Sequence, residues 1–418
     1  MHILLIHQAF ASLDEPGGTR HHELANHLAS RGHCVTIIAS PVSYLTGSRT
    51  VPARAPVAAS LPLLAGEGNA AERPGTVRIL RASAYAAHHR SFLHRLLAFV
   101  SFAVSSFFSG LRVRKVDIVW GTSPPIFQGV TAWLLAKIKG VPFLFEVRDL
   151  WPQFAVGVGV LKNRIIIRLS EGLERFLYRH ADRVLVNSPG YIGHVRQRGA
   201  KQVELIPNGV DTGMFDPGAD GKAFRSLHGL EGRFVVLYAG AHGLSNDLGV
   251  VLQTARLLEG KSSIRFVLLG DGKEKASLQR QASEMGLENV LFLPPVPKSQ
   301  VPGILAAADA CIAILMPIEA YRTTYPNKVF DYMAAGRPVV LAIDGVIRQV
   351  VEQAGCGVFV QPGDPSALAG AILDLEKHRK DARRMGVAGR KAVLRQFSRE
   401  IIAADLLRVL EKMQAAGR

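Results

Sequence analysis

Residues 234–270 read FVVLYAGAHGLSNDLGVVLQTARLLEGKSSIRFVLLG and contain the pattern on which the fold depends. The stretch begins and ends with an apolar run, 234–239 and 264–269, each of a length suited to one buried strand. A glycine-containing turn and a helix-length segment separate the two runs. Continuous apolar strands that alternate with helices are typical of a parallel sheet covered on both faces. This stretch therefore predicts the α/β class.

The same strand–helix unit recurs along the chain. Further apolar runs of this kind stand at residues 3–6, 34–40, 116–120, 142–147, 183–187, 290–296, 310–315, 338–343 and 357–360. Because 418 residues exceed what one hydrophobic core usually supports, we expect two domains with a boundary near Pro207. We predict two tandem doubly wound parallel-sheet (Rossmann-like) domains, residues 1–207 and 208–398, facing a cleft. Residues 399–418 are expected to form a helix that packs back across the domains.

Two segments of the first domain depart from this alternation. Residues 41–76 are rich in Ala, Pro and Gly and lack periodicity, which predicts a long mobile loop. Residues 91–115 have an uncharged core, 96–111, that is shorter than the ~20 apolar residues a spanning helix needs. Basic residues on both sides of that core suit a helix lying at an anionic membrane surface. A helix buried under a neighbouring sheet is the alternative.

The chain is strongly basic, with 50 Lys and Arg against 34 Asp and Glu and a net charge of +16. This balance favours anionic partners such as a membrane surface or acidic small molecules. The basic residues are scattered and do not alternate with aromatic residues, so we do not expect a nucleic-acid partner. The three cysteines stand alone, and the N-terminus lacks the features of a signal peptide. We expect a cytoplasmic protein, peripheral on the cytoplasmic face of the membrane.

Two loops at the carboxyl ends of first-domain strands carry candidate site residues. Gly17 and Gly18 precede an expected helix, so backbone N–H groups there are available to a phosphate or a hydroxyl-rich substrate; a plain turn is the alternative. Arg148, Asp149 and Trp151 directly follow a strand. That polar and aromatic combination favours a site, although an Arg–Asp pair that fixes the loop would also explain it.

Two loops of the second domain have similar features. In AGAHGLSND, residues 239–247, Gly243 allows close backbone approach, and His242 and Asn246 can bond a diphosphate or a sugar. Gly270 lies in LLGDGKE, before another expected helix. As isolated turns, both loops are also explained by structure alone.

Residues 321–340, YRTTYPNKVFDYMAAGRPVV, are the most informative stretch for function. We expect Thr324 to cap a helix that begins near Pro326 and ends at Gly336. Asn327, Lys328 and Asp331 then share one helical face, since neighbours on a helix lie three and four positions apart. Ala334 and Ala335 extend that face with almost no side chain.

This face suits a charged and hydroxylated ligand. The amides at the helix start carry partial positive charge and Lys328 adds a full one, so both would hold a diphosphate. Asp331, one turn further along, is placed to accept hydrogen bonds from a vicinal diol such as ribose. The alternative is a surface helix with an i,i+3 Lys–Asp pair, which leaves the small residues at 334 and 335 unexplained.

Several motifs are missing. The chain has no Asp-x-Asp, no G-x-x-x-x-G-K-[ST], no G-x-S-x-G and no Cys/His group with metal-ligand spacing. We therefore expect no metal and no cofactor, and a diphosphate whose charge is neutralised by Lys, Arg and helix ends.

Taken together, these motifs resemble those of family 4 glycosyltransferases of the GT-B fold, nearly end to end. LIPNGVDTGMF (205–215) is similar to the family's interdomain segment, and LLGDGKE (268–274) and FDYMAAGRPVV (330–340) are similar to its donor-site segments. FEVRDLWPQ (145–153) and YPNKVFDYMAAG (325–336) resemble the branch that builds bacterial surface polysaccharides, including fucosamine transferases.

The resemblance implies roles by position. Asp331 falls where the family's second donor-site carboxylate binds the ribose diol, and Asn327 and Lys328 fall beside the diphosphate and donor sugar. Gly17 and Gly18 match the family's first-domain glycine loop. Arg148 takes the place of a His that many members have next to the reacting sugar.

The chain also departs from the family pattern. Thr323 stands where the first Glu of Glu-x7-Glu is expected, and the second position is Asp331. The Arg and Lys that usually follow the first strand of the second domain are replaced. We take Lys328 as the substitute cation, with Arg322 in reserve.

The implied activity is a metal-independent, retaining transfer of a sugar from a nucleotide-diphosphate donor to a saccharide acceptor. UDP-sugars are the expected donors, with N-acetylated amino and deoxy sugars as candidates, and a lipid-linked saccharide is the expected acceptor in surface polysaccharide synthesis. Two alternatives remain: a nucleotide-sugar epimerase on the same fold, which needs carboxylate acid/base groups, and a non-catalytic GT-B-fold interaction protein.

Overall fold

The computed structural model describes residues 1–42, 59–60, 75–85, 92–216 and 218–416. The chain divides into two compact units, each with its own sheet. Residues 1–12, 17–207 and 400–418 form the first unit, and residues 13–16 and 208–399 form the second. The mobile loop expected over 41–76 lies outside the described residues, apart from its two ends and Ala59–Ser60.

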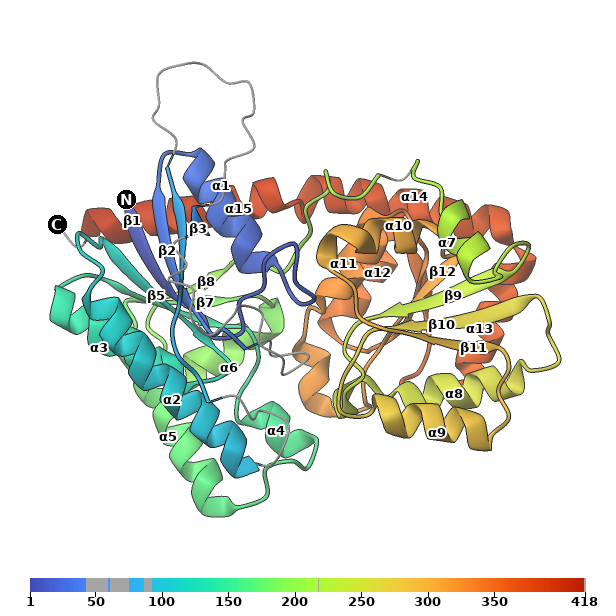
Figure 1. Ribbon diagram of the computed structural model, residues 1–418, viewed down its shortest axis with the longest axis horizontal. Helices are drawn as coiled ribbons and strands as arrows, with labels where there is room; N and C mark the ends of the chain where they lie inside the picture. The colour runs from blue at the N-terminus through green and yellow to red at the C-terminus, as the bar shows by residue number, and fades with distance from the viewer. Residues whose placement is uncertain (43–58, 61–74, 86–91, 217, 417–418) are drawn as a thin grey trace. The chain divides into compact units, whose positions relative to one another are not determined.

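The first unit is built on one sheet with β1 near its centre (Figure 1). The strand order is β3-β4-β2-β1-β5-β6-β7-β8, and every neighbouring pair is parallel except β3 with β4. Ile3 pairs with Val35 on one side and with Ile118 on the other. The strands are β1 (His2–Ile6), β2 (Cys34–Ala39), β3 (Ala59–Ser60), β4 (Val77–Arg81), β5 (Ile118–Ser123), β6 (Phe143–Val147), β7 (Arg183–Val186) and β8 (Val203–Leu205).

Helices cover both faces of this sheet because its central strands are apolar on both sides. Leu24 of α1 and Leu410 of α15 belong to the core on one face. Phe102 of α2, Leu135 of α3 and Leu177 of α5 belong to the core on the other. The helices are α1 (Arg20–Ser30), α2 (Phe92–Leu111), α3 (Phe127–Lys139), α4 (Gln153–Gly157), α5 (Arg164–His180), the 3-10 turn η1 (Pro189–Tyr191), α6 (Ile192–Gln197) and α15 (Arg399–Ala416).

Two features of the first unit were not visible in the sequence pattern. The strand β4 was not expected, because its exposed Arg78 interrupts the apolar run that marked the other strands. The helix α15 was expected to pack back across the domains, and the pattern did not show which core it joins: its buried side chains, including Leu406 and Leu410, belong to the core of the first unit.

The second unit repeats the same design with six parallel strands (Figure 1). The strand order is β11-β10-β9-β12-β13-β14. The strands are β9 (Phe234–Ala239), β10 (Ile264–Leu269), β11 (Val290–Leu293), β12 (Ala310–Ile314), β13 (Val339–Ala342) and β14 (Gly357–Phe359). The helices are α7 (Lys222–Leu227), η2 (Leu244–Asn246), α8 (Leu248–Leu257), α9 (Lys275–Glu284), η3 (Lys298–Gln300), α10 (Val301–Ala306), η4 (Glu319–Thr323), α11 (Asn327–Ala334), α12 (Val346–Ala354), α13 (Pro365–Lys377) and α14 (Arg379–Gln396).

Each sheet has a topological switch point, where the chain leaves two adjacent strands in opposite directions. In the first unit it lies between β1 and β5, and in the second between β9 and β12. Loops that leave the carboxyl ends of such strands open a crevice in which ligands bind in doubly wound folds. Most of the candidate site residues lie in the segments that follow these strands, whereas Arg148 and Gly270 follow the neighbouring strands β6 and β10.

Candidate functional site

The second-unit candidates come together at the switch point between β9 and β12. Residues 240–247 follow β9 and contain His242, Gly243 and Asn246. The helix α11, which carries Asn327, Lys328 and Asp331, follows β12 through the short η4.

The loops after β9 and β10 press against each other backbone to backbone. A Cβ on Gly270 would lie 1.9 Å from the Gly240 carbonyl oxygen, and one on Gly272 would lie 2.5 Å from that of His242. Gly270 also has a φ of +144°, a conformation that favours glycine. The structure thus gives Gly270 a packing role that is independent of any ligand. Gly243 has only one neighbour near its Cβ position, Asn246 Nδ2 at 3.8 Å.

The helix α11 begins at Asn327, with Pro326 in the N-cap position. Thr324 was expected to cap this helix and does not: its hydroxyl donates instead to the carbonyl oxygen of Tyr321 at 2.9 Å. Pro326 has no N–H and a restricted φ, which suits it to a helix start without a side-chain cap. Gly336 follows the helix with a φ of +65°, as expected for a C-terminal glycine.

The amine of Lys328 turns from α11 toward the β9 loop. Its Nζ donates to the Tyr238 hydroxyl at 2.7 Å and to Asn246 Oδ1 at 3.0 Å, and it lies 4.0 Å from the centre of the Tyr238 ring. A Cβ on Gly240 would approach this Nζ to 3.1 Å, so glycine there makes room for the amine. Lys328 is partly buried, and burial lowers the pKa of its amine to about 7.

Asp331 pairs with a lysine that the sequence analysis did not select. Lys298 Nζ lies 2.5 Å from Asp331 Oδ2, and both side chains are largely buried, with exposures of 13% and 15%. The same ammonium lies 5.3 Å from the centre of the Phe215 ring. The expected alternative, a Lys328–Asp331 surface pair, is wrong, because the two side chains turn to different partners. Lys298 lies in a short 3-10 turn with no periodic pattern around it, so nothing in the local sequence singled it out.

His242 is buried without a hydrogen-bond partner among the described residues. Its side chain is 0% exposed, and neither ring nitrogen has a partner there. Burial, with a further contribution from the charge of Lys275, lowers the pKa of His242 to about 4. A buried polar ring that lacks partners is uncommon, so His242 is an unusual feature of this loop.

Two further cations border the site, and their partners differ. Lys275 Nζ donates to the carbonyl oxygens of Gly270 and Leu293 at 2.7 and 2.9 Å. Arg322, the reserve cation, forms ion pairs with Glu319 at 3.3 Å and Asp344 at 3.2 Å. Because Arg322 already faces two carboxylates, Lys328 is the better candidate for an anionic ligand.

The small residues at the end of α11 face the protein core. Ala335 is 5% exposed and belongs, with Ala334, to a core cluster of the second unit. Arg390 of α14 donates to the Ala334 carbonyl oxygen at 2.6 Å. A Cβ on Gly386 of α14 would lie 2.0 Å from the Gly336 carbonyl oxygen. The expected ligand-facing role of Ala335 therefore needs correction, because a close α11–α14 contact accounts for these small side chains.

The first-unit candidates follow β1 and β6, on either side of β5 in the sheet order β1-β5-β6. Gly17 and Gly18 immediately precede α1, and a Cβ on Gly18 would meet no atom within 4 Å. Arg148 follows β6, and its NH2 group donates to the Pro124 carbonyl oxygen at 2.9 Å. Its guanidinium is therefore oriented by the loop after β5.

A buried polar network beside Arg148 was not anticipated. Glu146, on β6, is 0% exposed and accepts hydrogen bonds from His21 at 2.6 Å and Arg20 at 3.2 Å. Arg20 also donates to the carbonyl oxygens of Ile206 and Pro207. Burial alone would raise the pKa of Glu146, but His21 and Arg20 outweigh it and lower that pKa to about 2. A glutamate within an otherwise apolar strand was the available sequence signal for this network.

Neither unit offers a metal centre in its described residues. Within the ranges that the structure describes, no three His, Cys, Asp or Glu side chains lie close enough to hold a metal ion. No helix in these ranges is both long and apolar enough to cross a bilayer.

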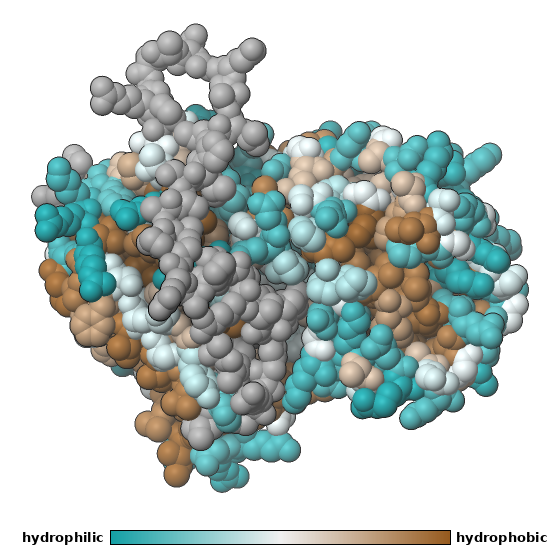
Figure 2. Space-filling model, in the orientation of Figure 1, coloured by the Kyte–Doolittle hydropathy of each residue, from teal (hydrophilic) through white to brown (hydrophobic). Residues whose placement is uncertain are grey.

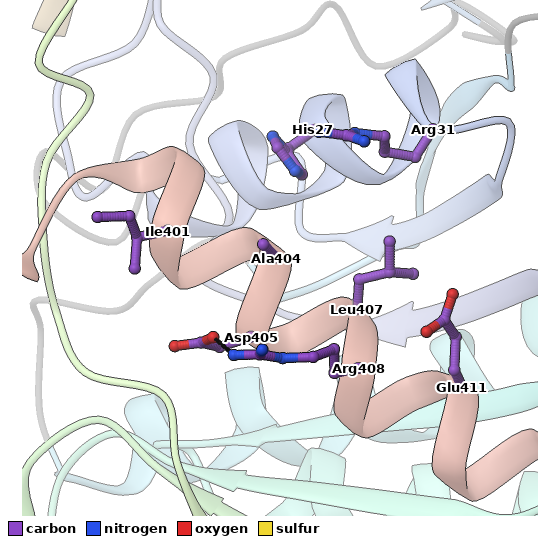
Figure 3. Close-up of a pocket in the computed structure, with 8 residues that line it drawn as sticks. All are labelled: His27, Arg31, Ile401, Ala404, Asp405, Leu407, Arg408 and Glu411. Atoms are coloured by element: carbon purple, nitrogen blue, oxygen red, sulfur yellow. Dashed lines mark hydrogen bonds and ion pairs between the residues drawn. The ribbon is translucent and has the colours of Figure 1, made fainter.

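A cavity of about 410 Å³ lies in the first unit, between α1 and α15 (Figure 3). None of the candidate residues lines it, and its polar side chains include the Arg408–Asp405 ion pair. It is lined by His27, Arg31, Ile401, Ala404, Asp405, Leu407, Arg408 and Glu411.

Two family models match the chain and together cover most of it. Residues 17–209 match a glycosyl transferase 4-like domain, and residues 233–378 match glycosyl transferases group 1. A protein of Escherichia coli K12 that bears the name colanic acid biosynthesis glycosyl transferase WcaI is 28% identical over 401 residues, covering 91% of this chain and 94% of that protein.

Solved structures share the fold of the whole chain. Sucrose-phosphate synthase from Thermosynechococcus elongatus superimposes with a TM-score of 0.78 at 20% identity, covering 99% of both chains. Anabaena Alr3699/HepE, solved in complex with UDP and glucose, has a TM-score of 0.71 at 17% identity and covers 99% of this chain and 100% of its own. The chain therefore belongs to the group 1 and 4-like glycosyl transferases and has their two-domain GT-B fold.

Proposed function

We propose that this glycosyl transferase moves a sugar from a UDP-sugar to a saccharide acceptor with retention at the anomeric carbon. The observation that carries the proposal is the Lys328 amine, which lies at the switch point beside the start of α11 and whose hydrogen-bond partners among the described residues are all neutral. A similar fold binds UDP and glucose in Anabaena Alr3699/HepE, and WcaI is named for colanic acid biosynthesis. Both support a nucleotide-sugar donor and a role in surface polysaccharide synthesis.

The diphosphate is proposed to bind against the amino end of α11. The Asn327 and Lys328 N–H groups lie in the first turn, where helix amides carry partial positive charge. Lys328 would supply the full charge that other members obtain from Arg and Lys in the β9 loop. Lys328 Nζ reaches Asn246 of that same loop, so Lys328 places its charge beside the loop that lacks the usual Arg and Lys.

The neighbouring groups fit the rest of the donor. Asp331 is proposed to bind the ribose diol while keeping Lys298 as its counter-ion. His242 and Gly243 provide polar ring atoms and open space beside the diphosphate. From the first unit, Arg148 and the Gly17–Gly18 turn are proposed as the remaining donor and acceptor contacts.

In this mechanism the C1–O bond of the donor breaks toward an oxocarbenium-like state, while negative charge grows on the departing diphosphate. Fixed donors aimed at that charge lower the barrier, and loss of one typically costs about 2.7–4 kcal/mol. The departing phosphate takes the proton of the acceptor hydroxyl on the same face, which gives retention. Lys328 and the α11 amides supply the charge that a divalent ion provides in other transferases.

The Lys328 role is tested by turnover. Lys328→Ala should lower the rate of UDP release in the presence of acceptor about a hundredfold, whereas Lys261→Ala, at an exposed lysine in the turn before β10, should have little effect. Activity that survives EDTA supports the metal-independent route. Unchanged turnover in Lys328→Ala, or activity lost in EDTA and restored by magnesium, would overturn it.

The acceptor is proposed to be a lipid-linked saccharide reached from an anionic membrane surface on the cytoplasmic face. Side chains on one face of α2 are exposed although apolar: Leu97, Val100, Val104 and Phe108 are 43–56% exposed. They recur every three or four residues, while Ala98 and Phe102 on the opposite face are fully buried. The helix is thus neither fully buried nor able to span a bilayer.

The exposed apolar face continues onto the neighbouring helices (Figure 2). Ile138 of α3 and Ile165 and Leu169 of α5 are 58%, 69% and 69% exposed. Neither α2 nor α3 contains an acidic residue. Exposed cations border this face at Arg112, Arg114, Lys115, Lys137, Arg164 and Arg168. Apolar side chains ringed by cations suit the interface of an anionic bilayer.

The membrane contact is tested by sedimentation with vesicles. Wild-type protein should bind vesicles that contain phosphatidylglycerol more than neutral ones, and Val104→Ser/Phe108→Ser should bind less. Leu227→Ser is the matched control, because Leu227 is 78% exposed on α7 of the second unit. Equal sedimentation of the double variant and the wild type would contradict the proposal.

A further inference from the structure

Two lysines border the proposed donor site, and they differ in how their charge is balanced. Lys298 has a carboxylate partner, Asp331, at 2.5 Å. The Lys328 amine has a phenol and an amide oxygen, at 2.7 and 3.0 Å, and no ion pair with any described residue. A charged Lys328 would therefore stand in a partly buried place where no carboxylate of the described residues compensates it.

The partners of Lys328 suit either protonation state of its amine. The Tyr238 hydroxyl donates its one hydrogen to the Ala241 carbonyl oxygen at 2.7 Å, so its oxygen accepts from Lys328, and an ammonium and a neutral amine both have a hydrogen to donate to it. Asn246 Oδ1 accepts a hydrogen from either form. The Tyr238 phenol itself stays protonated, because burial raises its pKa. No atom has to move when Lys328 gains or loses a proton.

Burial favours the neutral amine of Lys328 until an anion arrives. Burial lowers the pKa of Lys328 to about 7, well below the ordinary value of 10.5. Facing groups are Tyr238 on β9 and His242 and Asn246 in the loop after β9; His242 is uncharged near neutral pH. Asp331, one turn along α11, is neutralised by Lys298, and Lys275 adds positive charge beside His242.

We propose that nucleotide-sugar binding takes up one proton from solvent and that Lys328 receives it. The inference rests on the proposed donor site. The neutral amine and a solvent proton become an ammonium that pairs with the incoming diphosphate, and the proton returns to solvent when the nucleotide leaves. Above about pH 7, the Lys328 amine thus becomes fully cationic only when the donor is present.

The proton count should follow pH in a specific way. With a pKa of about 7 in the free protein and a much higher one in the complex, binding should take up about 0.1 proton at pH 6, 0.5 at pH 7 and 0.9 at pH 8. Linkage then weakens donor affinity as pH rises, approaching tenfold per pH unit above about pH 8. His242 does not contribute at pH 8, because its pKa of about 4 would have to rise by several units.

The experiment is isothermal titration of the full chain with UDP-glucose and UDP-N-acetylglucosamine at pH 8. These donors are diphosphate diesters without a phosphate that titrates near neutral pH, so the ligand contributes no proton. Titrations in several non-phosphate buffers of different ionisation enthalpy give the number of protons taken up. Lys328→Arg keeps a charge at every pH and should bind with less than about 0.2 proton taken up. His242→Gln should retain the uptake of about 0.9 proton.

The outcomes separate this inference from the proposed function. Donor binding with no proton uptake by the wild type overturns the inference and leaves the donor site intact. Uptake that is lost in His242→Gln, or kept in Lys328→Arg, assigns the proton to another group and also overturns it. Failure of every UDP-sugar to bind overturns both. If Lys328→Arg does not fold, Lys328→Gln replaces it and should also bind weakly without uptake.

Discussion

At the scale of single residues, Lys328 illustrates a conflict between stability and binding. Its amine is desolvated and has no compensating carboxylate among the described residues, a cost that the proposed role in donor binding would explain. Substitutions at functional sites of this kind commonly raise the stability of a protein and lower its activity. Replacing Lys328 should therefore change stability and binding in opposite directions.

We expect Lys328→Met to raise the thermal midpoint of the unliganded protein and to abolish UDP-sugar binding. The low pKa of Lys328 means that the unfolded chain binds more protons than the folded one between about pH 7 and 10.5. The wild type therefore gains stability as pH rises through this window, so the advantage of the methionine variant should be largest below pH 7 and disappear near pH 10.5. Scanning calorimetry at pH 6 and pH 9 measures it. A methionine variant that is less stable at pH 6 would refute this account.

Glu146 is the opposite case, a buried carboxylate with strong partners. Its pKa of about 2 lies below the ordinary value of 4.5, so its stabilising contribution is present above about pH 4.5 and is lost as pH falls toward 2. Glu146→Gln leaves the buried Arg20 guanidinium without its carboxylate and should lower the free energy of unfolding of the first unit by about 3 kcal/mol at pH 7.

Tryptophan fluorescence can follow this change selectively. All three tryptophans, Trp120, Trp133 and Trp151, lie in the first unit, so their signal reports that unit alone. The difference between Glu146→Gln and wild type should shrink as pH is lowered from 5 to 3. A difference that is constant over this range would indicate that the carboxylate charge contributes nothing.

At the scale of elements, the contact between the β9 and β10 loops decides the geometry of the site. Gly270→Ala places a methyl group 1.9 Å from the Gly240 carbonyl oxygen at a positive φ, so the two loops must separate. We expect it to lower the free energy of unfolding of the second unit by about 2–4 kcal/mol and to weaken UDP-sugar binding at least tenfold.

The matched control for Gly270→Ala is Gly249→Ala in α8, where a Cβ would meet no atom within 4 Å. Alanine in a helix should stabilise it by about 0.5–1 kcal/mol and leave binding unchanged. Circular dichroism during denaturation and calorimetric titration with UDP-glucose give the two quantities. Normal binding by Gly270→Ala would show that the loops do not set the site.

At the scale of the whole molecule, the last helix, α15, contributes its buried side chains to the first unit and should stabilise that unit. Ile402 is 1% exposed within the first-unit core, whereas its neighbour Ile401 is 38% exposed. We expect Ile402→Ala to lower the free energy of unfolding of the first unit by about 2–5 kcal/mol, and Ile401→Ala by less than about 1 kcal/mol. Tryptophan fluorescence during urea denaturation measures both. Equal losses of stability in Ile402→Ala and Ile401→Ala would show that Ile402 does not pack in the first-unit core.

The α/β class, the two-unit organisation and most strands were predictable from the sequence, because a parallel strand buried on both faces must be apolar along its whole length. The strand β4, next to the edge of its sheet, was missed, since its Arg78 faces solvent and breaks that pattern. The length and end of α11 were also predictable, because Pro326 and Gly336 act through their own backbones. Its N-terminal cap was misassigned, since Thr324 bonds a preceding carbonyl that spacing alone does not reveal.

What the sequence by itself determined is thus the set of elements and the chemical types available at their ends. Only the tertiary structure decided which groups meet: Lys328 with Tyr238 and Asn246, Asp331 with Lys298, and Ala335 with the core beneath α14. The physical reason is that periodicity reports which face of an element is buried, whereas a long flexible side chain selects its partner among residues distant in sequence. Hydrogen bonds and desolvation then set its charge, and those depend on neighbours that the fold brings together.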